Sequence, residues 1–408
     1  MPFFFSFKST FLLLFILFST CAQKQEEQTG QITLKSKPLK KEIVVAANRT
    51  KAYLPYLKDK NIAIVANQTS VLFKTKGYTH LVDSLLSLDV AIKKVFAPEH
   101  GFRGKADAGE LVKDGFDTKT QLPIISLHGK NRKPSKEQLK DVDLVVFDIQ
   151  DVGVRFYTYI ATLQLVMEAC AENNIPILVL DRPNPNAHYV DGPTMKAKHT
   201  SFLGMQQIPL VYGMTIGEYA KMVNEEGWLE DKVKADLTII ELENWTHLTS
   251  YSLPIRPSPN LPNDKSINLY PSLGLFEGTN LNAGRGTEFQ FQRYGASFLD
   301  STTYRFTYVP KPNFGSKYPK EEGKSCFGED LSSTEHMNSI SLKWLLKAYQ
   351  NSTDKSKFFI TSGFTKHAGT EKLQQQIKTG LSENEIKATW QKDIEAFKKV
   401  REKYLIYN

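Results

Sequence analysis

The segment at residues 143–159, DLVVFDIQDVGVRFYTY, constrains the fold of this chain more than any other. Its apolar run at residues 144–147 is short and continuous, as is typical of a strand buried on both faces of a parallel sheet. Polar residues and a glycine follow, and from Arg155 onward apolar residues recur every three or four positions. The segment therefore predicts a strand, a polar loop and a helix, in that order.

Four further apolar runs share this character, because each ends in polar sequence, and in three of them that sequence contains glycine or proline. They lie at residues 62–66, 94–97, 123–127 and 175–180, and the sequences that follow them are NQT, PEHGFRG, HG and DRPNP. Helical spacers separate most of the runs, so the chain is predicted to form an α/β fold with a Rossmann-like, doubly wound parallel sheet. Ligands bind at the carboxyl ends of such strands, so the five polar ends predict a cleft at one edge of the sheet.

The pattern changes after about residue 230, where a strand at residues 237–242 precedes a proline-rich passage. We therefore predict a smaller α+β domain after the sheet domain, with later strands at residues 304–309 and 358–361. A C-terminal amphipathic helix is expected at residues 383–404, with Ile386, Trp390, Ile394 and Phe397 packed into the core. The predicted segments are a signal peptide (1–21), a flexible tether (22–44), the Rossmann-like domain (45–230) and the α+β domain (231–408).

The N-terminus has the form of a bacterial lipoprotein signal. The apolar run at residues 11–18 follows Lys8 and is too short to cross a bilayer as a mature helix. Ser19 and Thr20 then precede Cys21 as in a lipobox, although Phe18 replaces the consensus leucine. This resemblance implies lipidation of Cys21 and a lipid-anchored protein of the bacterial cell envelope, facing the periplasm or the outer surface. The alternative is a plain secretory signal with an incidental cysteine.

Several classes of protein lack support in the sequence. The net charge of +8 comes from lysines spread along the chain, and no nucleic-acid-binding signature is present, so no nucleic-acid partner is predicted. The motifs GxGxxG, GxxxxGK[ST] and GxSxG are all absent, which argues against a dinucleotide cofactor, a P-loop NTPase and an α/β-hydrolase serine. Neither Cys170 nor Cys326 has metal-site spacing, so no cofactor or metal is predicted.

The second dense polar stretch is EGTNLNAGRGTEFQFQRY at residues 277–294. Its glycines, asparagines and charges exclude a core element, so it is either a long structural loop or a binding loop. Arginine, which binds carboxylates in a two-pronged geometry, is concentrated in and beside the dense stretches. The ordinary alternative is that these arginines pair with neighbouring acids.

The residue chemistry of the predicted cleft is compatible with two reaction types. Carboxylates combined with asparagine, glutamine and arginine are what glycoside hydrolysis requires. A metal-dependent hydrolase uses similar residues, although His100 and His128 lack the usual spacing of metal ligands. The residues alone therefore indicate a hydrolase or a sugar-binding protein.

Four motifs narrow this choice: APEHGFRG (97–104), VFDIQDVGVRFYTY (146–159), LDRPNP (180–185) and EGTNLNAGRGTEFQFQ (277–292). Together they resemble the NamZ/YbbC family of exo-β-N-acetylmuramidases, over roughly residues 45–408. The resemblance implies a Rossmann-like domain and a smaller C-terminal domain with the active site between them. It also implies release of N-acetylmuramic acid (MurNAc) from the non-reducing end of peptidoglycan fragments such as MurNAc–GlcNAc, in cell-wall turnover and recycling.

The resemblance also implies roles for individual residues. Glu99 matches the family's proposed catalytic glutamate and is expected to act as general acid or base. His100 is a further catalytic candidate, and Asp148, Asp151 and Glu288 are candidates for a partner carboxylate. The predicted substrate-binding residues are Asn67, Arg103, Gln150, Arg155, Tyr157, Asp181, Arg182, Asn184, Glu277, Asn280, Asn282 and Arg285.

Three of these arginines have a specific expected role, because MurNAc carries a lactyl carboxylate. Arg103, Arg155 and Arg285 are the candidates for binding it. The competing hypotheses are a non-catalytic surface lipoprotein that captures cell-wall sugars and a metal-dependent hydrolase. The density of carboxylates beside aromatic residues favours the glycosidase.

Overall fold

The computed structural model describes residues 1–3, 41–104, 110 and 113–407. The predicted signal peptide from residue 4 onward, Cys21 and residues 22–40 of the predicted tether lie outside the described residues. Residues from Glu42 onward form one compact unit, so the tether was predicted to extend slightly too far. Val44, the last residue of that tether, forms a β-bridge with Glu243 through two backbone hydrogen bonds of 3.0 Å. Within the described ranges, no helix has the length and apolar character needed to cross a bilayer.

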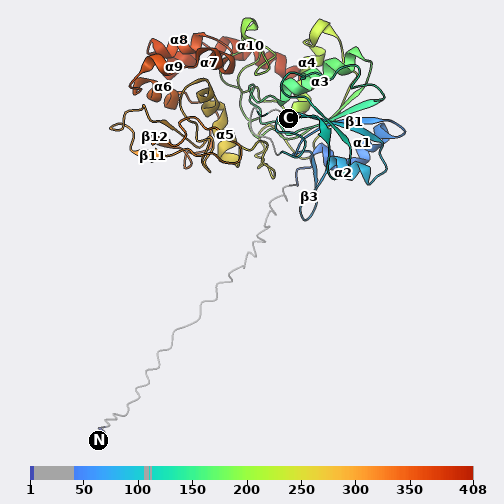
Figure 1. The fold of residues 1–408 in the computed structure, drawn as a ribbon, viewed down its shortest axis with the longest axis horizontal. Helices are drawn as coiled ribbons and strands as arrows, with labels where there is room; N and C mark the ends of the chain where they lie inside the picture. The colour runs from blue at the N-terminus through green and yellow to red at the C-terminus, as the bar shows by residue number, and fades with distance from the viewer. Residues whose placement is uncertain (4–40, 105–109, 111–112, 408) are drawn as a thin grey trace, which may run out of the picture. The chain divides into compact units, whose positions relative to one another are not determined.

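The largest sheet of the unit has seven strands in the order β5-β6-β4-β1-β7-β8-β9. In Figure 1 its strands spread out around β1. Six strands run parallel, and the short β5 pairs antiparallel with β6 at one edge. The strands are β1 (Ile62–Ala66), β4 (Ile92–Ala97), β5 (Gly115–Phe116), β6 (Pro123–Ser126), β7 (Leu144–Asp148), β8 (Ile177–Leu180) and β9 (Leu237–Ile240). A hairpin of β2 (Val71–Phe73) and β3 (Tyr78–His80) follows β1. The predicted α/β class and parallel sheet are confirmed.

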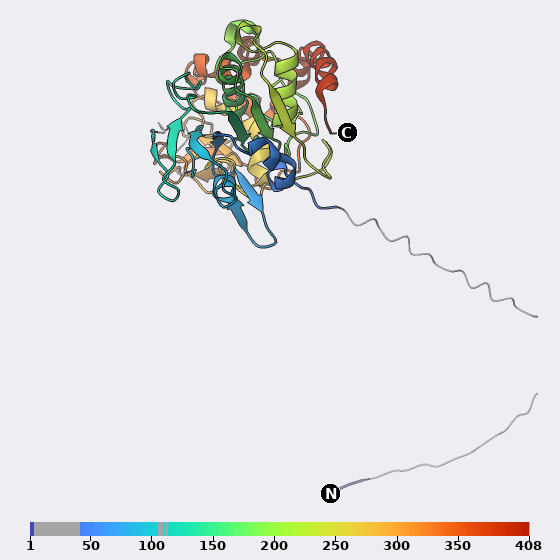
Figure 2. The same ribbon diagram turned by 90° about the vertical axis from the view of Figure 1, so that its right-hand side faces the viewer.

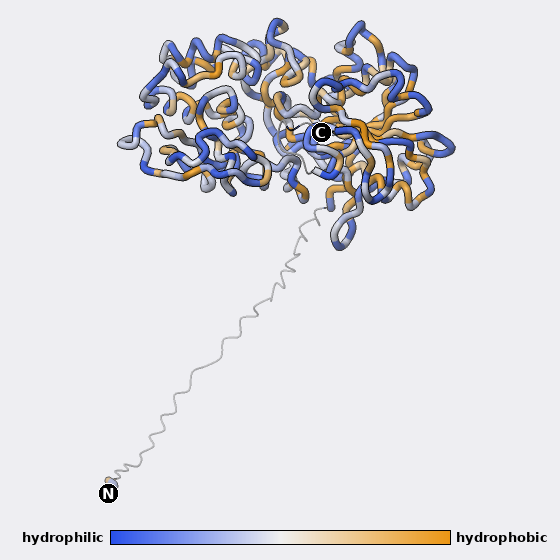
Figure 3. Tube along the Cα trace, in the orientation of Figure 1, coloured by the Kyte–Doolittle hydropathy of each residue, from blue (hydrophilic) through white to orange (hydrophobic). Residues whose placement is uncertain are grey.

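Helices cover both faces of the sheet (Figure 2), because its central strands are apolar on both sides. On β1, Ala63 and Val65 join the core that contains residues of α3 (Tyr159–Glu172) and α4 (Ile216–Glu225). Ile62 and Ile64 join the core that contains residues of α1 (Thr50–Leu57) and α2 (Leu81–Leu86). The sheet strands are accordingly the most continuously apolar part of the trace in Figure 3.

The polar ends of the strands meet at one edge of the sheet, as predicted. Ala66 at the end of β1 is in register with Asp148 at the end of β7, and Ala97 on β4 is in register with Ser126 on β6. Parallel strands in register bring the loops that follow them together. The motifs at residues 98–104, 149–158 and 181–185 therefore form adjacent parts of one edge.

The predicted domain boundary near residue 230 is wrong, because the large sheet continues past it. The strand expected at residues 237–242 is β9, which hydrogen-bonds in parallel to β8. The C-terminus also returns to this sheet, where the Tyr407 hydroxyl donates to Asp181 at 2.6 Å. The change of composition at residue 230 therefore marks a connection within the sheet domain.

The second part of the unit begins with α5 (Asp264–Leu273) and contains a three-stranded antiparallel sheet, in agreement with the predicted α+β character. The sheet has the order β10-β12-β11, formed by β10 (Arg293–Ala296), β12 (Cys326–Asp330) and β11 (Phe306–Tyr308). The remaining helices are α6 (Lys343–Gln350), α7 (Thr361–Ala368), α8 (Lys372–Lys378), α9 (Glu383–Ala388) and α10 (Gln391–Arg401).

Two element predictions in this part need correction. Residues 358–361 do not form a sheet strand, since Phe359 makes only an isolated bridge with Thr279 before α7 begins. The predicted C-terminal helix is divided into α9 and α10 at Thr389 and Trp390. The four residues expected in the core, from Ile386 to Phe397, are buried on both pieces, so the apolar stripe was identified correctly.

A buried ion pair joins the ends of β7 and β8. Nε and Nη2 of Arg182 donate to the two oxygens of Asp148 at 2.6 and 2.9 Å, and Nη2 also donates to the Val71 carbonyl at 3.0 Å. Both side chains are almost fully buried, so neither reaches a ligand. The predicted catalytic role of Asp148 and the predicted substrate-binding role of Arg182 are therefore replaced by a structural one.

We predict that Arg182→Met lowers the free energy of unfolding by about 3–5 kcal/mol, because it leaves the Asp148 carboxylate buried without its cation. Urea unfolding measures the change. The double variant Asp148→Leu/Arg182→Met removes both charges and should recover much of the loss. Wild-type stability in Arg182→Met would contradict this account.

Candidate active site

A cleft of about 270 Å³ lies at the carboxyl edge of the large sheet, between the loops of the sheet and residues of the second part. It contains two carboxyl groups, one from each part of the unit: Glu99 and Glu277. Its lining residues are Glu99, His100, Phe156, Tyr157, Thr158, Leu203, Ser258, Asn260, Leu261, Tyr270, Glu277, Arg285, Phe291 and His367. Polar groups among aromatic and aliphatic walls are typical of a site for a small polar molecule.

Glu99 reaches the cleft from the turn that follows β4. His100 and Gly101 both have left-handed backbone conformations, with φ of +72° and +76°, which turn the chain sharply at this point. The Thr158 hydroxyl donates to Oε2 of Glu99 at 3.0 Å, and the Tyr159 hydroxyl lies 3.4 Å from the Glu99 carbonyl. The first turn of α3 and the residue before it thus fix the position of the predicted catalytic glutamate.

Glu277 reaches the cleft from η4 (Gly274–Gly278), a 3-10 helix that directly follows α5. Nη1 of Arg285 donates to its Oε1 at 2.9 Å, and Nε2 of His367 lies 3.7 Å from its Oε2. Burial alone would raise the pKa of Glu277, but the interactions with His367 and Arg285 outweigh burial and lower the pKa to about 2. Glu277 is therefore an ionised carboxylate.

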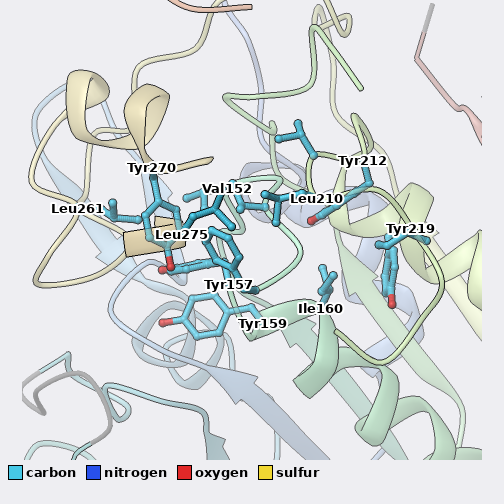
Figure 4. Close-up of a cluster of buried hydrophobic side chains, with 14 of the residues drawn as sticks. Val152, Tyr157, Tyr159, Ile160, Leu210, Tyr212, Tyr219, Leu261, Tyr270 and Leu275 are labelled. Carbon is cyan, nitrogen blue, oxygen red and sulfur yellow. The ribbon is translucent and has the colours of Figure 1, made fainter. Parts of the chain in front are cut away.

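Aromatic side chains, among them Tyr157 and Tyr270, form one wall of the cleft. Figure 4 shows these two tyrosines, and Tyr159 behind the wall, directing their hydroxyl groups to the same side. The rings of Tyr157 and Tyr159 are 4.8 Å apart, and the Tyr157 hydroxyl donates to the Pro257 carbonyl at 2.8 Å. Tyr270 packs edge-on against Phe156 and Phe291, at 5.1 and 4.8 Å. These contacts leave little rotational freedom to the wall.

A second compartment of about 210 Å³ shares Glu277 and Arg285 with the cleft. Asn282 and Lys320 also line it. The Asn282 amide donates to the carbonyls of Arg285 and Lys320 at 2.9 and 2.8 Å, which holds the two loops together. The Lys320 ammonium donates to the carbonyls of Phe276, Glu277 and Thr279 and so stabilises the end of η4. Asn282 thus lies in the second compartment with its amide bonded to backbone carbonyls, and its predicted role in substrate binding stays a prediction.

Three of the predicted catalytic carboxylates lie outside the cleft lining. Asp148 is in the ion pair described above, and Glu288 is exposed. Asp151 is buried, accepts from the Tyr212 hydroxyl and accepts from the Gly153 amide at 2.7 Å. Burial raises the pKa of Asp151 to about 7, against the lowering effect of Tyr212. The partner carboxylate that the cleft contains is Glu277, which the sequence analysis had placed among the binding residues.

Two of the three arginines expected to bind the lactyl carboxylate lie outside the cleft lining. Arg103 donates to Asp117 at 2.7 Å and to Asp83 at 3.3 Å, as in the ordinary alternative of pairing with nearby acids. Arg155 is buried and donates to three backbone carbonyls. Arg285 alone of the three lines the cleft.

Most of the other predicted binding residues support the loops of the sheet edge. Gln150 donates to the carbonyls of Asp151 and Pro183, both at 2.7 Å. Asp181 accepts from Thr215 and Gly217 at the start of α4, at 2.7 and 2.9 Å.

The amide side chains predicted to bind substrate are also engaged in the framework. Asn67 accepts from Thr69 and Asn184 donates to the Met214 carbonyl, each at 2.8 Å. Asn280 is exposed and donates to the Lys357 carbonyl. Of the predicted binding set, Tyr157, Glu277 and Arg285 line the cleft.

The sequence analysis missed several cleft residues, of which His367 is the most informative. It lies on α7, just before Gly369 ends that helix with φ of +77°. Tyr270 on α5 and Asn260 in the proline-rich passage were also missed. None of the three follows a strand of the large sheet, so the pattern that located Glu99 could not find them.

Among the residues that the structure describes, no three or more histidine, cysteine, aspartate or glutamate side chains form a group that could hold a metal ion.

The fold and cleft define an α/β protein with a pair of carboxyl groups in a small site at the sheet edge. Comparisons with known proteins place it more narrowly. Residues 62–265 match the family described as "Exo-beta-N-acetylmuramidase NamZ, N-terminal", and residues 268–407 match its C-terminal counterpart. The chain therefore belongs to the NamZ family.

Individual relatives agree with this assignment. The chain is 38% identical over 373 residues to "Peptidoglycan beta-N-acetylmuramidase NamZ" of Bacillus subtilis (strain 168), covering 87% of this chain and 89% of that protein. Crystal structures of two DUF1343 family proteins from Bacteroides fragilis NCTC 9343 have the same fold. One is 44% identical with a TM-score of 0.82, the other 26% identical with a TM-score of 0.76, and each match covers 90% of this chain and 99% of that one. The resemblance drawn from the four motifs is confirmed.

Proposed function

We propose that this protein is an exo-acting β-N-acetylmuramidase that hydrolyses the terminal non-reducing β-1,4-linked MurNAc of peptidoglycan fragments. Family membership supports the reaction class. The observation that carries the assignment to this chain is the cleft, in which Glu99 of the PEHG motif and Glu277 of the EGTN motif lie together. Paired carboxyl groups are what glycoside hydrolysis requires.

Glu99 is the proposed general acid. It gives its proton to the glycosidic oxygen while the bond from that oxygen to the anomeric carbon breaks, so the electron pair leaves with the released sugar as a hydroxyl group. Water then adds to the anomeric carbon and gives a proton to the Glu99 carboxylate, which completes free MurNAc and restores the acid. Because Glu277 stays ionised above about pH 2, it has no proton to donate in the neutral range.

The size of the cleft supports attack at a chain end. Ligand sites for drug-sized molecules span about 300–1,000 Å³, so a cleft of 270 Å³ suits one substituted sugar ring better than a length of glycan strand. The rigid aromatic wall of Tyr157, Tyr270 and Phe291 gives that ring an apolar surface.

We predict that Glu99→Gln lowers kcat for release of MurNAc from MurNAc–GlcNAc by roughly 10²–10⁴-fold, because the amide cannot donate the required proton. The assay measures free MurNAc, with and without chelator, and calorimetry measures binding, which should persist. Glu395→Gln, at an exposed position on α10, is the matched control and should keep the wild-type rate. Saturable binding without release by the wild type would instead indicate a capture protein, and loss of activity in chelator a metal-dependent hydrolase.

Arg285 is the proposed contact for the lactyl carboxylate of MurNAc. It lines both the cleft and the second compartment, and its side chain is 26% exposed, so the guanidinium presents a charged donor to a ligand. A carboxylate oxygen satisfies such a donor with a charge-assisted hydrogen bond.

Arg285→Gln is therefore expected to reduce the preference for MurNAc over GlcNAc. One charge-assisted hydrogen bond is worth about 1.5–3 kcal/mol, so the ratio of the two affinities should fall roughly tenfold or more. Competitive inhibition by the two free sugars measures the ratio, and GlcNAc, which lacks the lactyl group, serves as the internal control. An unchanged ratio would exclude this contact.

We further propose that the mature protein is lipid-anchored through Cys21 in the cell envelope, on the sequence pattern alone. Cys21→Ser removes the thiol that would carry the lipid, so the protein should lose both radiolabelled fatty acid and its place in the membrane fraction. Cys170→Ala, which alters a buried thiol of α3, should keep both. Unlabelled wild-type protein would indicate a plain secretory signal.

A further inference from the structure

The contacts of Glu277 indicate a role for this second carboxyl group of the cleft. Glu99 accepts from the neutral hydroxyl of Thr158 at 3.0 Å. Glu277 lies between two potential cations, with Arg285 on one oxygen and His367 near the other. The side chains of Glu277, Arg285 and His367 are 25%, 26% and 13% exposed, so their interaction is only partly screened by solvent.

The orientation of His367 is set by its own helix. Its Nδ1 lies 2.9 Å from the Gly363 carbonyl one turn earlier, and because a carbonyl can only accept, Nδ1 carries a proton. Nε2 then points towards Glu277, 3.7 Å away. A second proton on Nε2 makes the ring an imidazolium that donates towards the carboxylate, whereas a neutral ring would present a lone pair to it.

Arg155 holds the main chain of His367 in place. Its Nη2 donates to the His367 carbonyl at 3.0 Å, and its Nη1 donates to the carbonyls of Pro193 and Ile208 at 2.7 and 2.8 Å. Gly369 packs directly on the guanidinium, since a Cβ there would lie 2.7 Å from Nη2. Burial lowers the pKa of Arg155 to about 9, in keeping with a cation that has only carbonyl partners.

We propose that Glu277 is the second catalytic carboxylate, held in its ionised form by Arg285 and His367, and that Arg155 is a positioning residue for His367. This inference rests on the proposed function. The transition state of glycoside hydrolysis carries positive charge at the anomeric carbon and ring oxygen. A preorganised negative charge in the same cleft stabilises that charge without rearrangement.

Other groups around Glu277 are compatible with this role. Lys320 adds positive charge nearby, although its ammonium is bonded to backbone carbonyls. Tyr270 also neighbours Glu277, and burial with the charges of Glu277 and Glu99 raises its pKa, so it stays a neutral phenol. Glu99 is the only other carboxyl group among the cleft-lining residues given above.

The decisive experiment compares the pH dependence of kcat in Glu277→Gln, His367→Gln and wild type. Glu277→Gln should lower kcat by about 10²–10³-fold while MurNAc binding changes only a few-fold, because the lost interaction strengthens in the transition state. His367→Gln removes one of the two partners that lower the pKa of Glu277, so that pKa should rise from about 2. In the pH profile of kcat, activity falls on the acidic limb as Glu277 becomes protonated. For His367→Gln this limb should therefore lie higher than in the wild type by about one pH unit or more.

Arg155→Lys tests the positioning role, because lysine keeps the charge but cannot reproduce the three carbonyl contacts. Its acidic limb should move in the same direction as that of His367→Gln. His188→Gln is the matched control, since that histidine contacts the Met337 carbonyl outside the cleft and should leave the limb in place. Urea unfolding of each variant identifies losses of activity that come from misfolding.

Two results would overturn the proposal. One is a wild-type kcat in folded Glu277→Gln, and the other is an unmoved acidic limb in His367→Gln, even if its activity falls uniformly. If Glu277→Gln does not fold, the limb of His367→Gln decides the question alone. Failure of the proposed function itself looks different, because the wild type would then release no MurNAc at any pH.

Discussion

The guanidinium group of Arg155 joins three chain segments to its own loop, one of them at the cleft-lining His367. It comes from the loop after β7, contacts carbonyls at residues 193 and 208, and reaches the carbonyl of His367 on α7. A guanidinium has five donors in a rigid plane, so it can hold several carbonyls at fixed angles. This buried cation is therefore one of the contacts that hold α7 of the second part against the loops of the large sheet.

Buried polar groups next to the cleft follow the same physical rule, which is that each charge taken from water needs a partner. Asp148 has Arg182, and Asp181 has Thr215, Gly217 and Tyr407. Such side chains are fixed by their partners and are not available to a ligand. The groups that can act on a substrate are those left at the cleft surface, and Glu99 and Glu277 are the carboxyl groups in that position.

The polar ends of the strands predicted a cleft at one edge of the sheet, but they did not predict which side chains face that cleft. A strand ending in polar residues identifies a position at the sheet edge, and Glu99 was found in this way. The same rule predicted functional roles for Asp148, Asp151 and Arg155 as well, although their side chains are buried in the protein. A sequence pattern places a residue on a helix, strand or loop. The direction of its side chain depends on partners distant in the sequence, as the Arg155 side chain depends on His367.

The sequence by itself determined the fold class, the alternation of strands and helices that makes the sheet parallel, and the motifs that meet at one edge. These features are local, because apolar periodicity and glycine or proline punctuation act over a few residues. Only the tertiary structure decided that β9 belongs to the large sheet and that Glu277 is the carboxylate sharing the cleft with Glu99. It also decided that His367 and Arg285 flank Glu277. Ion pairing depends on distances of a few ångströms between residues far apart in the chain, and only the packed structure fixes those distances.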